Sequence, residues 1–197
     1  MNALQCLLSR RSYHAHQLCA PAPAGAQLER ILSTAMTAAD HGSLRPWRFI
    51  LIEGQAIAKL VQLLTLIWQR NHPEASAEQI AAGLAFIAQA PQIIAVAAKV
   101  KPEHPVPAIE QILAAGAACQ NVLNALHAEG FGAIWYSGET CYSDEFKKLM
   151  GLAVEDALLG YLFTGTPIQV GERKRASVVP HCFSWQGAGN LQPLQFC

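Results

Sequence analysis

The stretch AADHGSLRPWRFILIEG, residues 38–54, joins a polar and aromatic cluster to a run of apolar residues. Its second half, WRFILIEG, predicts a β-strand that follows a turn. A strand in this position needs only apolar residues, so four side chains require a reason beyond folding: His41, Ser43, Arg45 and Trp47. We therefore treat this cluster as a candidate binding segment and ask which other segment it works with.

The composition indicates one globular domain that associates with a partner. A chain of 197 residues fits a single core, since domains usually span about 100–200 residues. Only 14% of the residues are charged and 52% are hydrophobic, whereas about 25% charged residues is typical of soluble domains. We expect part of the apolar surface to be buried against another subunit.

The charge balance argues against nucleic-acid and membrane binding. Lys plus Arg and Asp plus Glu both number 14, so no general basic field attracts a polyanion. No basic run accompanies an amphipathic stretch, which a membrane surface would require. Any anion site is expected to be local.

Cysteines and the amino-terminal segment bear on the cellular compartment. The six cysteines are scattered without a CxxC pair, which favours neither a disulfide framework nor a zinc ribbon. The start MNALQCLLSRRSYH lacks the features of a signal peptide, and no uncharged apolar run with membrane-type flanks reaches about 18 residues. We expect a cytoplasmic protein.

Hydrophobic periodicity predicts helices and strands that alternate loosely. Helices are expected over 2–10, 26–40, 55–70, 76–90, 109–130 and 143–151, and strands over 47–54, 92–100, 131–138 and 157–167. The continuous apolar strand QIIAVAAKV is expected to be buried on both faces. The class is α/β in the mixed, α+β sense. The tail after residue 167 shows no period, and a tail of this length usually wraps something.

The segment SRRSYH is the first candidate for chemistry. Arg10 and Arg11 end a predicted helix, where cations interact favourably with the helix dipole by up to ~1 kcal/mol. The same guanidinium groups, with the Ser12 hydroxyl, also match the geometry of a phosphate. Both interpretations stay open from position alone. Glycine-rich phosphate loops are absent from the sequence, so side chains would have to hold any phosphate.

Other reactive residues offer weaker candidates. Cys119 lies within an apolar helical pattern and is expected to be a core residue. The cluster of His14, His16 and Cys19 lacks the second pair of ligands that a closed metal site needs, so we expect no metal. No catalytic nucleophile is predicted, because the sequence holds no Gly-x-Ser-x-Gly elbow.

Three aromatic residues stand beside predicted turns: Trp47, Trp135 and Tyr136. Packing in the hydrophobic core would explain these residues, because a tryptophan buries a large apolar area and needs only one partner for its N–H group. A wall against a flat aromatic ligand explains them as well. Taken alone, they favour the core.

In combination, these segments resemble the FMN-dependent nitroreductase family, in particular a short, minimal branch of NAD(P)H nitroreductases. RRS after the first helix, SLRPWRFILIEG, GFGAIWYSG after the long helix and GYLFTGTP occur in the order and at the approximate spacing of that family. The resemblance covers nearly the whole chain. It implies a central antiparallel or mixed sheet flanked by helices, an intertwined homodimer, and a single domain over 1–197 whose extension, about 168–197, wraps the partner.

The resemblance also assigns FMN contacts to eight residues: Arg10, Arg11, Ser12, Thr37, His41, Trp135, Tyr136 and Ser137. The RRS residues would hold the phosphate and the ribityl end. The two polar residues before the first strand would reach in from the partner subunit, which explains the opening cluster. The WYS residues would line the isoalloxazine ring.

The activity implied is transfer of a hydride from NADH or NADPH to FMN, followed by two-electron reduction of a nitroaromatic, quinone or similar small aromatic acceptor. One shared site gives ping-pong kinetics. The nicotinamide preference and the physiological acceptor are not specified by the sequence.

Several positions depart from the family pattern. His14 and His16 stand where many relatives have a Lys or Arg near the pyrimidine edge of the flavin, which predicts a flavin that is harder to reduce. Thr37 and Tyr136 also stand where basic residues are expected. The segment 171–175, GERKR, is a candidate to restore positive charge, and a solvated loop explains Lys174 and Arg175 equally well. Two alternatives therefore stay open: a flavin-binding or flavin-storing protein without efficient turnover, and a structural dimer without flavin.

Overall fold

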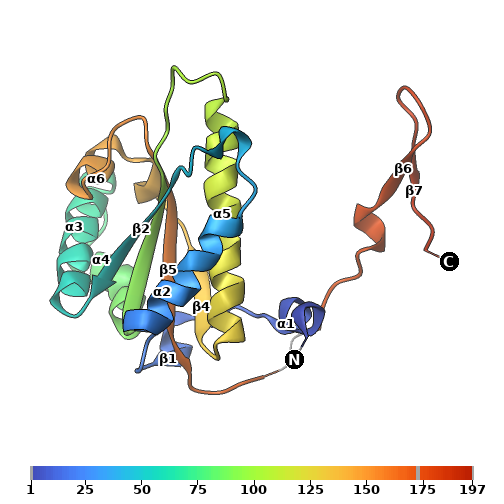
Figure 1. Cartoon of the computed structure of the whole chain (residues 1–197). Helices are drawn as coiled ribbons and strands as arrows, with labels where there is room; N and C mark the ends of the chain where they lie inside the picture. The colour runs from blue at the N-terminus through green and yellow to red at the C-terminus, as the bar shows by residue number, and fades with distance from the viewer. Residues whose placement is uncertain (1, 172–173, 197) are drawn as a thin grey trace.

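The computed structural model describes residues 2–171 and 174–196. An antiparallel sheet forms its middle layer (Figure 1), with the strand order β2-β3-β5 and with β1 and β4 both pairing the outer side of β5. The strands are β1 (Leu18–Cys19), β2 (Trp47–Glu53), β3 (Gln92–Ala98), β4 (Gly132–Tyr136) and β5 (Ala157–Pro167). The predicted α+β class is confirmed.

Helices cover both faces of this sheet. They are α1 (Ala3–Ser9), α2 (Gly25–Ser33), α3 (Gln55–Asn71), α4 (Ala77–Leu84), α5 (Ala108–Ala128) and α6 (Asp144–Leu149). α3 and α4 lie on one face and α2 and α5 on the other (Figure 1). Among the described residues, no helix is long and apolar enough for a membrane span.

The protein has a hydrophobic core on each face of the sheet, and strand β3 contributes to both. Its continuous apolar sequence predicts this burial on both faces. Ile93, Ala95 and Ala97 pack with the α3 and α4 side, while Ile94 and Val96 pack with the α2 and α5 side. All seven residues of the strand are buried. Cys119 is also fully buried, which confirms that it is a core residue.

Local signals place several helix ends where the sequence predicts them. Ser76 and Gln79 form the reciprocal capping box of α4, and Ser143 caps α6. Gly130, with φ +86°, follows the end of α5 in the left-handed conformation that glycine favours. α2 is shorter than predicted, because the Ser33 and Thr34 hydroxyls donate to backbone carbonyls of the preceding turn and a 3₁₀ turn over Thr34–Thr37 follows.

Strand β5 has a bulge at Gly160, next to the last residue of β4. Gly160 has φ +131°, and a Cβ atom there would collide with the Tyr136 carbonyl oxygen. The register between β3 and β5 shifts at this level. Beside the bulge, the Trp135 indole Nε1 donates to the Leu159 carbonyl at 3.0 Å. A position without a side chain therefore allows β4 to approach closely.

Residues 174–196 form an arm that projects from the body of the molecule (Figure 1). Its strands β6 (Phe183–Trp185) and β7 (Leu191–Pro193) pair as a hairpin that the sequence pattern did not predict. The arm exposes large apolar side chains: Val178, Val179, Phe183, Trp185, Leu191, Leu194 and Phe196. This is the segment for which the sequence predicts contact with a partner.

Candidate functional site

The RRS segment lies directly beside strand β4. Ser12 forms a parallel bridge with Ala133, and the Tyr13 backbone N–H donates to the Ala133 carbonyl at 3.1 Å. Two residues beyond Ala133, the same strand reaches the WYS segment, 135–137. The fold thus brings together the predicted phosphate-binding segment and the predicted ring-lining segment, which are more than one hundred positions apart in the sequence.

Three arginines lie at the end of α1 in the sequence or contact this helix, and we call Arg10, Arg11 and Arg175 the arginine cluster: Arg10 and Arg11 directly follow the helix. The Arg175 Nε atom donates to the Leu8 carbonyl at 3.1 Å, which places the start of the arm against this helix. His127, at the end of α5, lies 2.8 Å from the Ser9 hydroxyl through its Nε2 atom. Burial, Arg10 and Arg175, in that order, lower the pKa of His127. The region is electropositive, as a phosphate site requires.

Arg11 carries a buried donor that an anion could satisfy. Its Nε atom is buried and has no hydrogen-bond partner among the described residues. The guanidinium carbon lies 4.9 Å from the centre of the Tyr13 ring, and a Cβ atom on Gly171 would lie 2.6 Å from Arg11 Nη1. A buried unsatisfied donor costs about 1–3 kcal/mol. These residues fit a phosphate group, which would satisfy the donor.

The three WYS residues do not play equal parts. Trp135 packs toward the α5 side and already uses its indole N–H, so its side chain serves the core. Tyr136 points to the other face, where its ring lies 5.0 Å from Phe86 and 4.9 Å from Phe163 between centres. Its hydroxyl lies 2.9 Å from His14 Nδ1. Ser137 is exposed at the end of the strand.

Thr37 and His41 lie elsewhere in the same chain. Asn121 Nδ2 donates to Thr37 Oγ1 at 3.2 Å, and His41 Nδ1 lies 2.6 Å from Glu110 Oε2. Glu110 and His127 are 17 positions apart on α5, which corresponds to about 25 Å along a helix axis. Within one chain, therefore, His41 does not join the arginine cluster, and its contribution from a partner subunit stays a prediction.

The residues immediately before β2 have an unusual backbone conformation. Ser43 and Arg45 have φ values of 54° and 47°, and Gly42 has 74°. The Arg45 backbone N–H donates to Asp40 Oδ2 at 2.6 Å and closes the loop. Non-glycine residues in this conformation cluster at binding sites, in keeping with a reason beyond folding for this stretch.

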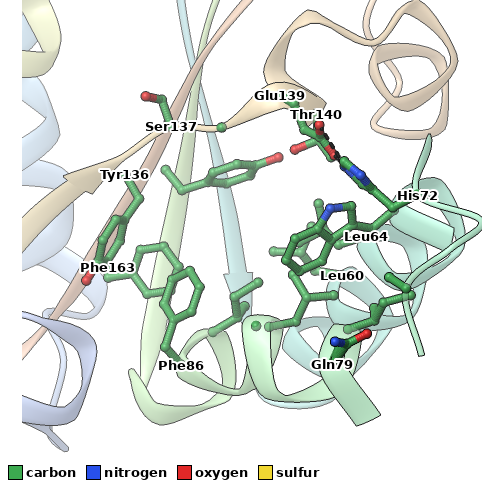
Figure 2. A pocket seen from close by; sticks show the side chains of 18 of the residues that line it. Leu60, Leu64, His72, Gln79, Phe86, Tyr136, Ser137, Glu139, Thr140 and Phe163 are labelled. Carbon is green, nitrogen blue, oxygen red and sulfur yellow. Dashed lines mark hydrogen bonds and ion pairs between the residues drawn. The ribbon is translucent and has the colours of Figure 1, made fainter. Parts of the chain in front are cut away.

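Tyr136 points into a large pocket that lies between α3, α4 and the sheet (Figure 2). Its volume is about 790 Å³. Tyr136 and Ser137 form part of its wall, together with Phe86 and Phe163. The sequence did not predict this pocket, because it arises from packing between segments 55–90 and 136–163.

The family profile of the nitroreductases matches residues 7–166. The chain belongs to the nitroreductase family. One relative, the "Putative NAD(P)H nitroreductase YdjA" of Escherichia coli (strain K12), is 38% identical over 169 residues, which cover 85% of this chain and 89% of the relative. Family members are oxidoreductases, so an oxidoreductase enzyme is supported at this level.

Solved structures show the nitroreductase fold. A nitroreductase-like family protein from Bacillus cereus superposes with a TM-score of 0.78 at 22% identity, covering 95% of this chain and 97% of the other. A nitroreductase from Desulfovibrio desulfuricans, solved in complex with FMN, gives a TM-score of 0.70 at 21% identity, with coverage of 95% and 98%. The predicted nitroreductase-like fold is confirmed.

Two residues beside the arginine cluster, Tyr13 and His127, were outside the list of site residues predicted from the sequence. Tyr13, adjacent to RRS in the sequence, carried a local signal. His127 lies at the end of α5, and only the tertiary fold brings it there. Gly171 and Arg175 belong to the segment 171–175, which the sequence named as a candidate source of positive charge, and residues 172–173 of that segment lie outside the described residues.

Proposed function

We propose that this protein is an FMN-dependent NAD(P)H oxidoreductase that works as a homodimer. The observation that carries the proposal is the buried, unsatisfied Nε atom of Arg11 within an arginine cluster beside β4. Family membership and the names of the relatives support the same activity.

Each part of the site has a role in binding FMN. The arginine cluster and the Ser12 hydroxyl would hold the phosphate, since guanidinium groups bind phosphate oxygens in pairs. Tyr136, Ser137 and His14 would face the ring at the end of β4. Bound FMN supplies hydride transfer from NADH or NADPH and two-electron reduction of a nitroaromatic, quinone or similar small aromatic acceptor.

His14 and Tyr136 set the polarity of the ring edge. Burial raises the pKa of the Tyr136 hydroxyl, and the backbone amide of Ala15 has a smaller effect that lowers this pKa. With the imidazole proton on Nε2, the Tyr136 hydroxyl donates to His14 Nδ1. In that tautomer, His14 offers one neutral donor to the flavin, which stabilises added negative charge less than a cation does.

Exposed apolar residues support the homodimer. They lie on α1 (Leu4 and Leu8), at the start of α5 (Ile109 and Leu113) and along the arm. We propose that a second copy covers these surfaces, that the arm wraps it, and that Thr37 and His41 of one chain reach the flavin of the other. Burial of this surface would explain the low content of charged residues.

The test is spectroscopic. Purified protein supplemented with FMN is expected to retain flavin absorbance after gel filtration and to lose that absorbance when NADH or NADPH is added without oxygen. Arg11→Gln is expected to weaken retention, while Arg70→Gln is the control, because Arg70 lies on α3 and pairs with Glu145. Absence of both flavin retention and NAD(P)H oxidation would contradict the proposal.

A second candidate is a flavin-binding protein without efficient turnover. It is favoured by Tyr136 and His14, which offer the ring no positive charge where relatives often do. Stable FMN retention together with no NADH or NADPH oxidation would select this candidate.

A further inference from the structure

The chain passes the arginine cluster at two points between the end of β5 and the arm. A Cβ atom on Gly171 would lie 2.6 Å from Arg11 Nη1, so the backbone runs beside that guanidinium group. Further along, the Arg175 Nε atom donates to the carbonyl of Leu8, in the last turn of α1, at 3.1 Å. We call Gly171 and Arg175 the arm root, and this root belongs to the candidate phosphate site.

The arm root carries a positive charge into a region that is already positive. Arg10 and Arg11 directly follow α1, whose carbonyl end attracts cations. Arg10 and Arg175 both act on His127, since their charges lower its pKa after the larger effect of burial. Guanidinium groups that lie near the same imidazole repel one another. Docking of Arg175 on α1 is therefore opposed by its neighbours until an anion offsets their charge.

A phosphate group would remove this repulsion and add attraction. A phosphate monoester carries about 1.5–2 negative charges at neutral pH and three acceptor oxygens. The buried Nε atom of Arg11, which has no partner among the described residues, needs one acceptor. The other oxygens can accept from a second guanidinium group, and Arg175 is held at the end of α1. The phosphate that satisfies Arg11 would therefore also hold the arm root against α1.

The arm root sets where the arm leaves the body of the molecule (Figure 1). Beyond the root, the arm carries exposed apolar side chains, with Phe183 and Trp185 in its hairpin. In the proposed homodimer, the second copy buries these side chains. An arm whose root is fixed samples fewer directions, so it loses less conformational entropy when it binds the partner. Phosphate binding and assembly would then be linked, and such a linkage is reciprocal.

We propose that the arm root couples occupancy of the phosphate site to assembly of the homodimer. A bound phosphate monoester docks Arg175 on α1 and thereby directs the arm onto the second copy. This inference rests on the proposed FMN site and homodimer, and it adds a regulation of that site: assembly responds to the phosphate group and not to the flavin ring. Arg175 is a positioning residue in this scheme, because it acts on the dimer through the path of the arm.

FMN and riboflavin are matched probes, since they share the ring and the ribityl chain and differ in the phosphate. The dimer dissociation constant of the full-length protein is measured by sedimentation at concentrations that saturate the protein with each flavin. FMN is expected to lower this constant about tenfold relative to riboflavin, within the range of about 5- to 150-fold that is typical of coupled sites. Inorganic phosphate alone is expected to lower it relative to potassium chloride of equal ionic strength, because the effect needs no ring.

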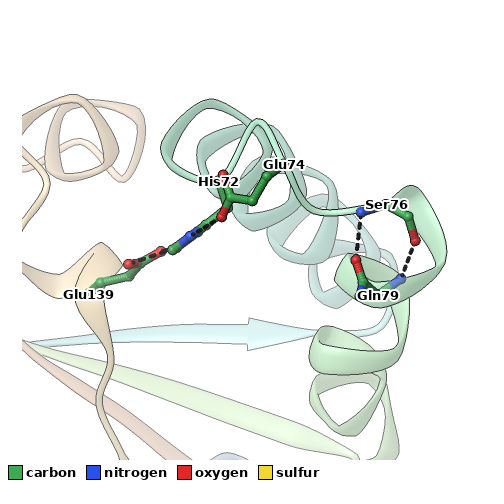
Figure 3. Close-up of polar contacts among 5 residues, drawn as sticks. All are labelled: His72, Glu74, Ser76, Gln79 and Glu139. Atoms are coloured by element: carbon green, nitrogen blue, oxygen red, sulfur yellow. Dashed lines mark hydrogen bonds and ion pairs between the residues drawn. The ribbon is translucent and has the colours of Figure 1, made fainter.

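Three variants assign the coupling to the arm root. Arg175→Gln is expected to bring the ratio between the FMN and riboflavin values to about one. Lys174→Gln, at the exposed neighbouring position, is expected to keep the wild-type ratio. His72→Gln is a second control: it removes the ion pair between His72 Nε2 and Glu139 Oε1, 3.0 Å apart at the end of α3 (Figure 3), and leaves α1 and the arm untouched.

Hydrogen exchange separates docking of the arm root from assembly. At a protein concentration at which the wild type is monomeric, inorganic phosphate is expected to slow the exchange of the backbone amides that follow Arg175, and Arg175→Gln is expected to abolish this effect. Exchange that phosphate leaves unchanged would overturn the proposal.

The remaining outcomes also decide. Equal dimer affinity with FMN and riboflavin, or a difference that survives Arg175→Gln, would overturn the coupling while FMN retention and NAD(P)H oxidation still support the proposed function. A phosphate effect in a protein that neither retains FMN nor oxidises NAD(P)H would contradict the proposed function alone. A wild type that stays monomeric with and without FMN would overturn both the homodimer and its coupling to phosphate.

Discussion

His14 Nδ1 lies 2.9 Å from the hydroxyl oxygen of Tyr136, although the two residues are 122 positions apart in the sequence. The contact holds the segment after RRS to the last residue of β4. His14 and His16 also stack with their ring centres 5.8 Å apart. The bond therefore fixes both the path of this segment and the orientation of an imidazole beside the candidate flavin site.

Tyr136→Phe removes this contact without changing the aromatic packing. We expect the imidazole of His14 to lose its tautomer preference, which the ¹⁵N chemical shifts of the ring report. Because a donor beside the ring stabilises reduced flavin, the midpoint potential is expected to become more negative. Tyr142→Phe is the control, since Tyr142 is 83% exposed. An unchanged potential would exclude His14 from the ring edge.

Arg11→Gln removes the guanidinium group whose Nε atom is unsatisfied. Hydrogen bonds to charged groups contribute about 1.5–3 kcal/mol, so we expect FMN affinity to fall about 10- to 100-fold. Fluorescence quenching of FMN measures this. Arg70→Gln is the matched control, because Arg70 pairs with Glu145 on the α3 and α6 side. Equal affinity in Arg11→Gln and wild type would place the phosphate elsewhere.

His127 gives the site a pH dependence of predictable sign. Burial and then the charges of Arg10 and Arg175 lower its pKa in the folded protein. Near pH 6.5, the unfolded chain therefore binds more protons at this position than the folded chain does, and stability falls as the pH decreases through this range. His127→Gln is expected to lose less stability than the wild type between pH 7.5 and 5.5 in urea denaturation.

An NMR titration of His127 tests whether the FMN phosphate binds to the arginine cluster. A phosphate bound to the arginine cluster would offset the positive charges, so addition of FMN is expected to raise the pKa of His127. Titration of its ring protons with and without FMN measures the change. No change would mean that the phosphate binds away from this cluster.

The sequence predicted most elements because their signals are local. The capping box at Ser76 and Gln79, the glycine after α5 and the continuous apolar run of β3 act within a few residues. β1 was missed because its two residues are defined by pairing with Thr166 and Pro167, not by their own pattern. The hairpin of the arm was missed because neither of its strands alternates clearly.

The site was predictable only in part, for a related reason. The resemblance pointed to RRS and WYS, and the fold places them side by side through Ser12 and Ala133. Arg175 reaches Leu8 across 167 positions, and Gly171, which follows β5 in the sequence, lies close to the Arg11 guanidinium. No local pattern encodes such contacts, because tertiary packing creates them.

Gly160 is expected to be essential to the geometry of β4. Gly160→Ala would combine a strained backbone with a collision against the Tyr136 carbonyl, and we expect a loss of about 2–5 kcal/mol in the free energy of unfolding. Gly116→Ala in α5 is the control and is expected to add up to about 1 kcal/mol. Equal melting temperatures for the two variants would show that the bulge tolerates a side chain.

The arm offers the most direct test of the homodimer. Phe183 and Trp185 are 54% and 71% exposed in the single chain, and burial of a large apolar side chain stabilises by about 1.5–3 kcal/mol. Replacing both with Ser is therefore expected to raise the dimer dissociation constant by at least about 100-fold, measured by sedimentation. Leu66→Ser is the control, because Leu66 is 52% exposed on α3, away from the arm. FMN affinity should fall in parallel with dimer dissociation, since Thr37 and His41 would no longer reach the partner's flavin. A dimer of undiminished affinity in the double variant would show that the arm does not wrap the partner, and a monomeric wild type would rule out the two-chain site.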